Sequence, residues 1–310
     1  MENTQETKQT IEVQEPAEPR VPAAKGLPKK ETLLYALTIL VSAFLLFQVQ
    51  PVIAKIILPW FGGTAAVWTT CLLFFQIVLL LGYLYAHALF RYLQPRAQMF
   101  THLGLLAASL LALPILPNVS WKPLGGEDPL FRILALLAVT VGLPYFLLST
   151  TGPLVQAWYA RRFHGSMPYR LYALSNIGSM FALLSYPVLF EPVFGTRQQA
   201  TNWSLGYGVF VLLCGLTAFF SGKAAESAGD TPSTENALEP APGKRQYFFW
   251  LALPACASTL LLAITNHLSQ NVAAIPFFWV IPLILYLITF VLVFARWPVV
   301  WTERPHNAVL

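Results

Sequence analysis

The stretch FQVQPVIAKIILPWFGG, which begins at Phe47, puts polar side chains and prolines at the end of a long apolar run. Gln48 and Gln50 lie beside Pro51, and a proline inside a helix frees a carbonyl about one turn upstream. An amide can pair that carbonyl or a neighbouring helix, and Lys55, one turn later, can reach the polar edge of a membrane. Two interpretations stay open. The stretch is a helix-ending turn held to other helices, or it lines a polar cavity of the kind that broken helices form in transporters.

A second polar stretch, ITNHLSQN, ends another apolar run. At helical spacing Asn266 shares a face with Gln270, and His267 shares one with Asn271. For His267 alone, the competing interpretation is a hydrogen-bonded residue at the membrane edge, with no ligand or proton chemistry. Two polar, broken helix ends in corresponding positions point to a central cavity. The predicted polar cavity consists of Gln48, Gln50, Asn266, His267 and Gln270.

A third stretch, YRLYALSNIGSMFALL, carries small residues four positions apart. Such small-xxx-small pairs let two helices approach closely, and an asparagine among them can hydrogen-bond across the contact. The pairs are Ser175 with Ser179 and Gly178 with Ala182, and Asn176 lies on the same side. These five residues form the predicted helix-packing face.

Catalytic signatures are absent from the sequence, which has no GxGxxG or Walker loop, no HExxH and no GxSxG. The 14 Asp and Glu residues fall almost entirely in a tail, a linker and loops, so no paired-carboxylate site is expected. Cys71, Cys214 and Cys256 lie singly in apolar runs and predict small core residues. We expect no cofactor and no metal. The Lys and Arg residues form no basic stripe for nucleic acid.

Composition identifies the setting of these residues. Of the 310 residues, 56% are hydrophobic and 11% are charged, and the mean hydropathy is +0.59. A soluble domain carries about 25% charged residues, so this chain has too little polar surface to cover a soluble fold. From Leu33 onward, apolar segments recur near the ~20 residues that span a bilayer. Because they are continuous runs, they predict an all-α, polytopic integral membrane helix bundle.

About eight transmembrane helices are expected. Residues 1–30 are charged and lack an apolar run, which is typical of a disordered cytoplasmic tail. A six-helix membrane bundle over 31–221 is followed by a flexible cytoplasmic linker over 222–246, and 247–310 begins a second membrane repeat. The expected helices are 33–57, 66–90, 99–117, 131–159, 171–194, 203–221, 247–269 and 274–295.

The basic residues predict the orientation of these helices. With a cytoplasmic N-terminus, only Lys55, Lys122, Arg132 and Arg197 of the 19 Lys and Arg residues fall outside, and the other 15 fall inside. Cytoplasmic loops carry the excess of Lys and Arg in membrane proteins. The distribution therefore favours an N-in, C-in topology.

The first and seventh expected helices are alike. SAFLLFQVQ and STLLLAITN each precede a proline-containing junction and a tryptophan, Trp68 or Trp279. The order fits the parallel repeat of the two halves of major-facilitator transporters. The alternative is that two membrane hairpins look alike by composition. If the repeat is real, the chain stops two helices into its second half and is expected to be a fragment or a truncated relative.

Taken together, these stretches resemble the bacterial membrane proteins known as spermidine synthase-like, or fused major-facilitator/spermidine synthases. The resemblance covers most of residues 40–295 and rests on QPVIAKIILPWFGGTAAVW with FFQIVLLLGYLYAH, on YRLYALSNIGSMFALLSYPVLFEPVFG, and on TNHLSQNVAAIPFFWVIPLILYLITFVL. Relatives often carry an acid where this chain has Asn271. They typically continue into a cytoplasmic aminopropyltransferase-like domain with a Gly-rich loop and catalytic acids, and none of that occurs before Leu310.

Two functions from different classes remain. The resemblance implies the membrane module of a spermidine synthase-like protein in the bacterial inner membrane, serving as an anchor or as a conduit for a polyamine-related substrate. Its expected partners are the lipid bilayer and an aminopropyltransferase-like domain, in cis downstream or in trans, and the chain alone is expected to transfer no aminopropyl group. The alternative is half of a major-facilitator-like secondary transporter for an unknown small molecule.

Overall fold

The computed structural model describes residues 29–62, 64–123, 125, 129–163, 169–227, 243–271 and 276–294. These residues form helices joined by turns, and no strand occurs among them. The α-helices are α1 (Lys29–Phe61), α2 (Ala65–Tyr92), α3 (Pro95–Ser109), α4 (Pro129–Leu137), α5 (Leu143–Arg162), α6 (Tyr169–Ser185), α7 (Glu191–Val193), α8 (Thr196–Ser227), α9 (Lys244–Asn271) and α10 (Pro276–Phe294).

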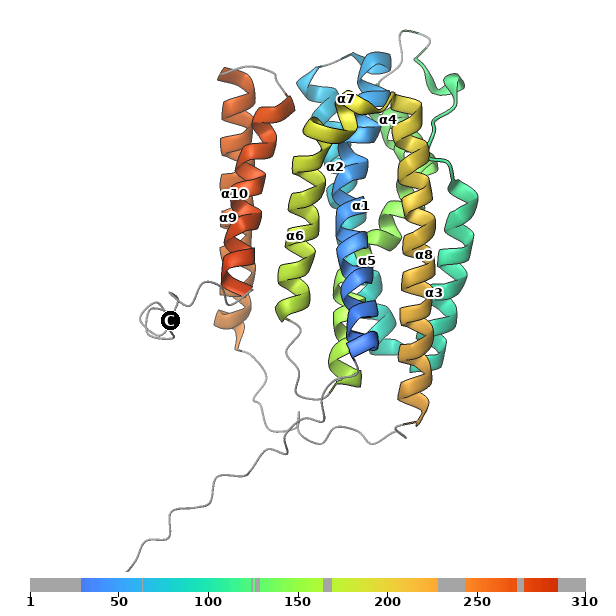
Figure 1. Cartoon of the computed structure of the whole chain (residues 1–310). Coiled ribbons are helices and arrows are strands. Elements are labelled where there is room, and N and C mark those ends of the chain that lie inside the picture. The colour runs from blue at the N-terminus through green and yellow to red at the C-terminus, as the bar shows by residue number, and fades with distance from the viewer. Residues whose placement is uncertain are drawn as a thin grey trace, which may run out of the picture.

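The long helices stand side by side as a bundle, with α9 and α10 as a hairpin beside α6 (Figure 1). α1 packs against α5, α6 and α8, while α2 packs against α5 and α3 against α8. Successive long helices run in opposite directions. We call the end at which α1 begins the tail end, and the end at which α1 turns into α2 the turn end.

Among the residues that the structure describes, six helices are long and apolar enough to cross a membrane. The prediction of an all-helical chain is therefore confirmed, and its helices have the length and composition of membrane spans. The six stretches are Lys30–Phe61, Ala66–Tyr92, Pro129–Arg162, Arg170–Val193, Thr196–Gly222 and Lys244–Thr265.

Two of the eight expected spans are not among these six stretches. α3 has 15 residues, or about 22 Å at ~1.5 Å per residue, against a hydrocarbon core of ~30 Å. A 3₁₀ turn, η1 (Leu110–Ala112), extends it. α10 has 19 residues, and the apolar stretch recorded within it is Ile281–Phe294.

Helix ends reach into segments expected to be irregular. α8 continues to Ser227 and α9 begins at Lys244, so both enter the expected linker over 222–246. The reason at the end of α8 is its KAAES run, because Ala, Lys and Glu are strong helix formers. Residues 1–28 of the expected tail and 228–242 of the expected linker lie outside the described residues.

The core of the bundle surrounds α1. Val49, Ile53 and Ile57 are completely buried there, and they join one apolar cluster with side chains of α2, α5 and α8. Large apolar side chains such as Leu80 and Leu212 are exposed instead on the outer faces. Extensive exposed apolar surface marks contact with a membrane or another protein.

Two π-helical segments interrupt the long helices beside α1. η3 (Ala138–Gly142) joins α4 to α5, and η4 (Tyr186–Phe190) joins α6 to α7. A π-turn closes i→i+5 hydrogen bonds, and single π-turns inside α-helices are frequent at functional sites. Both segments position tyrosines that contact α1, as described below.

Candidate functional site

Gln50 and Pro51 lie inside α1, because the helix continues through Pro51 and Pro59 to Phe61. The expected break at this point is therefore a proline within a continuous helix. Nε2 of Gln50 donates to the hydroxyl oxygen of Tyr145 over 3.4 Å. Tyr145 is buried in the first turn of α5, which follows η3 directly. This bond therefore ties the middle of α1 to α5. Gln50 thus contacts a neighbouring helix, but the helix-ending turn of the first interpretation is wrong, because α1 continues to Phe61.

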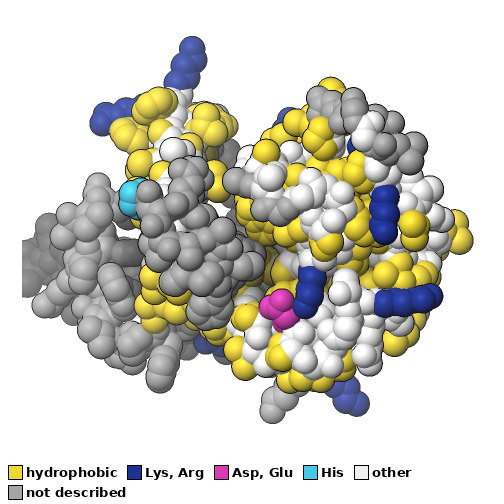
Figure 2. Space-filling view, turned by 90° about the horizontal axis from the view of Figure 1, so that it is seen from above, with side chains coloured by type: hydrophobic (Ala, Val, Ile, Leu, Met, Phe, Trp, Pro, Cys, Tyr) yellow, Lys and Arg dark blue, Asp and Glu magenta, His cyan; other side chains and the backbone are white. Residues whose placement is uncertain are grey.

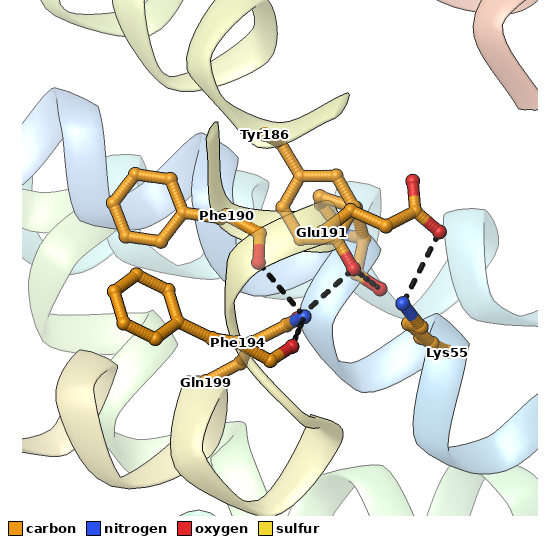
Figure 3. Close-up of polar contacts among 7 residues, drawn as sticks. Lys55, Tyr186, Phe190, Glu191, Phe194 and Gln199 are labelled. Carbon is orange, nitrogen blue, oxygen red and sulfur yellow. Dashed lines mark hydrogen bonds and ion pairs between the residues drawn. The ribbon is translucent and has the colours of Figure 1, made fainter. Parts of the chain in front are cut away.

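A second tyrosine approaches α1 at the next residue (Figure 3). The hydroxyl oxygen of Tyr186, in η4, lies 3.4 Å from the carbonyl oxygen of Pro51 and 3.1 Å from Oε1 of Gln199. A phenol has one hydrogen to donate, so Tyr186 serves one of these acceptors at a time. Two tyrosines from two π-interrupted helices therefore hold α1 at Gln50 and Pro51.

Gln199 closes the corner between α7 and α8. Its Nε2 donates to the carbonyl oxygens of Phe194 and Phe190, over 2.7 and 3.3 Å (Figure 3). The last carbonyls of a helix have no partner within the helix, so a side-chain amide that reaches back to them caps the end. Because its Oε1 accepts from Tyr186, the cap is connected to α1.

Lys55 and Glu191 form an ion pair at the turn end. Nζ lies 3.2 Å from Oε1, and the side chains are 34% and 47% exposed. In the view onto this end, an acidic patch adjoins a basic one (Figure 2). The pair joins α1 to α7, so Lys55 has a carboxylate partner at the position where the sequence predicted only an extended side chain.

Gln48 differs from Gln50 in having a buried donor without a partner. The side chain is 3% exposed, and its Nε2 has no hydrogen-bond partner among the described residues. At i, i+3 spacing it lies one turn before Pro51 on the same side of α1. A buried amide without a partner is rare and costs free energy. Gln48 is therefore the member of the predicted cavity whose buried amide nitrogen has no hydrogen-bond acceptor among the described residues.

The second half of the predicted cavity lies on α9, in its last two turns. His267 is exposed there, and the side chains of Asn266 and Gln270 lie outside the described residues. α9 packs on α10, and α10 packs on α6, which itself lies against α1 (Figure 1). α10 and α6 thus stand between the helix that carries this stretch and α1, which carries Gln48 and Gln50.

The predicted helix-packing face has its closest approach at Gly178. A Cβ at Gly178 would lie 2.8 Å from the carbonyl oxygen of Leu40 and 3.3 Å from Cβ of Ala43, so only glycine fits against α1 here. Ala182 and Ser179 are buried as well, and Ser175 is partly exposed. Asn176 donates to the carbonyl of Tyr172 over 2.8 Å, and Ser179 to that of Ser175 over 3.0 Å. The hydrogen bonds found for these two side chains therefore stay within α6.

Sequence reasoning missed a second glutamine corner. Nε2 of Gln98, in α3, donates to the carbonyls of Leu93 and Phe90, and its Oε1 accepts from Nε1 of Trp158 over 3.1 Å. Arg161 also donates to that oxygen, over 3.3 Å. Gln98 and Gln199 each stand in the first turn of a helix that follows a sharp corner, and this shared position was the available signal.

His102 was also missed and is completely buried in α3. Its Nδ1 lies 3.4 Å from the hydroxyl of Tyr85, and its Nε2 lies 3.5 Å from Sγ of Cys214. The described residues hold no group of three or more His, Cys, Asp or Glu that could bind a metal ion. The described side chains around α1 include neutral amides and phenols, which can hydrogen-bond a small polar molecule.

Comparisons of the chain with protein-family models, with curated proteins and with solved structures give no match. The class that the fold and the site define is thus a broad one. It is an all-helical protein whose described residues include six helices of membrane-spanning length around an apolar core with a few buried amides and phenols.

Proposed function

We propose that this chain is a polytopic membrane module that serves as the anchor of a spermidine synthase-like protein. The observation that carries the proposal is the division between long apolar helices and charges gathered near the helix ends. The link to polyamine chemistry rests on the sequence resemblance over residues 40–295. The partner would be a cytoplasmic aminopropyltransferase-like domain, in cis or in trans, in the bacterial inner membrane.

In this proposal eight helices cross the bilayer, with both termini in the cytoplasm. α3 crosses as the shortest span, by local thinning of the bilayer or by its flanking residues. The tail end would face the cytoplasm, because it holds most of the described basic residues, and the turn end would face outward. The basic residues at the tail end whose side chains the structure describes are Lys30, Arg91, Arg96, Arg161, Arg162, Arg170, Lys244 and Arg245.

The anchor role is favoured over the conduit role by the charge of the bundle interior. A polyamine carries several positive charges, and moving them through a dry interior without acids is costly. Glu31 and Glu191 are the carboxylates whose side chains the structure describes, and both are ion-paired at the two ends of α1. Between them α1 presents hydroxyls, amides and apolar side chains.

A second candidate, half of a major-facilitator-like secondary transporter, is favoured by the likeness of two three-helix units. Gly82 of α2 lies against Ser149 of α5, and Gly178 of α6 lies against Leu40 of α1. One glutamine closes the α2–α3 corner at the tail end, and another closes the α7–α8 corner at the turn end. When α1, α2 and α3 are matched with α5, α6 and α8, the α2–α5 contact corresponds to the α6–α1 contact, and the two glutamine corners correspond to each other. Because the two corners lie at opposite ends of the bundle, this is the arrangement of an inverted repeat. The parallel repeat of α1 with α9 belongs to the same candidate.

The orientation is tested by reporter fusions at residues 30, 95, 165 and 235 of the chain. All four should report the cytoplasm, because the tail end carries the positive charge. A periplasmic signal at 165 would contradict the topology. A reporter placed after Leu310 should stay with the membrane after a carbonate wash and remain accessible from the cytoplasmic side, as an anchor requires.

The two candidate functions are separated with the purified protein in lipid vesicles. For an anchor, spermidine flux should equal that of protein-free vesicles, and no methylthioadenosine should form from putrescine and decarboxylated S-adenosylmethionine. Flux in proportion to the protein would favour the transporter. Methylthioadenosine in proportion to the protein would reveal a catalytic site that the described residues do not explain.

A further inference from the structure

The guanidinium group of Arg161, in the last turn of α5, has neutral partners among the described residues. Its Nη1 donates to Oε1 of Gln98 over 3.3 Å, and its Cζ lies 5.3 Å from the ring centroid of Phe90. A guanidinium group has five N–H donors, so these contacts leave donors unused. The side chain is only partly exposed, at the tail-end corner where α2, α3 and α5 pack together. Arg161 therefore holds a positive charge in a partly desolvated place, beside groups that do not neutralise it.

The neighbouring residue, Arg162, has the same group at the same helix end but with a counter-charge. Its Nη2 lies 2.6 Å from Oε2 of Glu31, and its Nη1 donates to the carbonyl of Phe220 over 2.6 Å. Glu31 is the carboxylate whose side chain the structure describes at the tail end, and it is paired with Arg162. The helices that form the corner of Arg161, namely α2, α3 and α5, contain no acidic residue. They therefore supply no carboxylate to Arg161.

Exposed apolar side chains adjoin this positive charge. Phe90, whose ring lies beneath the guanidinium group, is 40% exposed, and Leu93 is 38% exposed. Phe90 belongs to the membrane-length stretch Ala66–Tyr92, so in a membrane its open side contacts lipid. Arg91 is exposed and lies 5.8 Å from the ring centroid of Tyr92, so it adds a second positive charge at the end of α2. The corner thus presents cations and apolar surface next to each other.

These two properties identify the class of ligand. A guanidinium group can bind a phosphate with two parallel hydrogen bonds, and the phosphate supplies the negative charge that the corner lacks. The exposed ring of Phe90 fits an apolar group attached to that phosphate, as an acyl chain is in a phospholipid. A zwitterionic phospholipid brings its own ammonium group, which Arg91 repels, whereas an anionic phospholipid brings a net negative charge. Basic pockets between transmembrane helices on the cytoplasmic side bind anionic headgroups in other membrane proteins.

We propose that the corner of Arg161, Arg91 and Phe90 binds an anionic phospholipid, with the phosphate on Arg161 and an acyl chain against Phe90. The lipid is then the counter-charge of Arg161, as Glu31 is that of Arg162. It joins the ends of α2 and α5 beside the corner that Gln98 closes. The inference rests on the proposed placement of this chain in a membrane, and it holds equally for an anchor and for a transporter.

The test measures lipid binding to the purified full chain by native mass spectrometry in detergent. Phosphatidylglycerol and phosphatidylcholine with the same acyl chains are titrated separately, and the ratio of their affinities is the readout. The unaltered chain should prefer phosphatidylglycerol. Arg161→Gln keeps an amide donor but carries no charge, so it should lower the ratio by about fivefold, the contribution of one basic residue near an anionic lipid surface. Arg161→Lys, which keeps the charge, should retain most of the preference.

Two controls separate a site from the overall charge of the tail end. The double variant Glu31→Gln with Arg162→Gln removes a neutral pair next to the site and should leave the ratio unchanged. Arg170→Gln removes one exposed positive charge at the start of α6 and should also leave it unchanged. A ratio that Arg161→Gln does not lower, or that Arg170→Gln lowers equally, would overturn the proposal.

A second variant keeps the test decisive if Arg161→Gln does not yield folded protein. Arg91→Gln, at an exposed residue, should lower the ratio by about twofold, and an unchanged ratio would then contradict the proposal. Glycerol 3-phosphate, which carries the phosphate without acyl chains, should not displace phosphatidylglycerol at equal concentration. Displacement would show that the corner binds a free phosphate ester and would overturn the assignment to a lipid.

The membrane placement is measured separately, so that the two proposals fail in different ways. Release of the chain from membranes by a carbonate wash would contradict the membrane module itself. Retention in the membrane together with equal ratios for the unaltered chain and Arg161→Gln would contradict the lipid site alone. Retention together with a lower ratio for Arg161→Gln is the result that we expect.

Discussion

Gln98 and Gln199 perform the same task at opposite ends of the bundle with different connections. Each amide nitrogen caps the end of the preceding helix through two carbonyls. The oxygen of Gln98 accepts from an indole and a guanidinium of α5, whereas that of Gln199 accepts from a single phenol. That phenol also has the carbonyl of Pro51 within reach. The tail-end corner is therefore attached to α5. At the turn-end corner, the hydroxyl of Tyr186 can exchange the oxygen of Gln199 for the carbonyl of Pro51 as its acceptor.

The largest expected effect distinguishes the two corners directly. Gln98→Leu should lower the free energy of unfolding by about 3 kcal/mol, and Gln199→Leu by about 2 kcal/mol, because each removal leaves buried partners unsatisfied. The Gln98 variant leaves one more donor without its acceptor. In the Gln199 variant, the hydroxyl of Tyr186 can donate to the carbonyl of Pro51 instead. Denaturant unfolding in detergent micelles measures both values. Gln94→Leu, an exposed residue whose side chain makes no capping bond, is the control, and an equal or reversed order would contradict the comparison.

A second prediction compares the two glycine contacts. Gly178→Ala should cost about 2 kcal/mol, because its nearest atom is a backbone oxygen of α1 that cannot move without the helix. Gly82→Ala should cost about 1 kcal/mol, since its nearest atom is the rotatable hydroxyl of Ser149. Gly208 has no heavy atom within 4 Å of an added Cβ, so Gly208→Ala should stabilise the helix by a few tenths to about 1 kcal/mol. Melting temperatures in one detergent rank all three.

A smaller effect is expected at the tyrosines. Tyr186→Phe should cost about 1 kcal/mol, because it removes the donor to Gln199 at 3.1 Å. Tyr145→Phe should cost about 0.5 kcal/mol, since the 3.4 Å contact from Gln50 is long. Thermal unfolding of the two variants measures the difference. A larger loss for Tyr145→Phe would show that Gln50, and not the Gln199 corner, is the main attachment of α1.

The smallest effect is expected at Lys55 and Glu191. Their double-mutant cycle, with Lys55→Met and Glu191→Gln, should give a coupling of about 0.5 kcal/mol, as for other exposed ion pairs. The coupling should weaken further between low and high salt. A coupling that survives high salt would show that the pair is shielded from solvent, for example by lipid headgroups at the turn end.

The sequence predicted the features of this fold that depend on local chemistry. Continuous apolar runs identified the long helices, and a glycine among small residues identified the face where Gly178 meets α1. The roles of Gln98 and Gln199 were not predicted, because each depends on donors from distant parts of the chain, Trp158 in one case and Tyr186 in the other. The role of Tyr145 was not predicted for the same reason, and also because the extra residue of the π-turn changes the direction in which its side chain points.

That one-residue shift at η3 has a consequence for how this chain tolerates length changes. A π-turn holds one residue more than the α-helical turn it replaces, so η3 amounts to an insertion absorbed inside a helix. Deleting a single residue from Ala138–Gly142 would keep α4 and α5 helical but rotate one against the other by about 100°. Tyr145 would then point away from Gln50. The identity of the five residues matters less than their number, so insertions and deletions should be harmful where many substitutions are accepted.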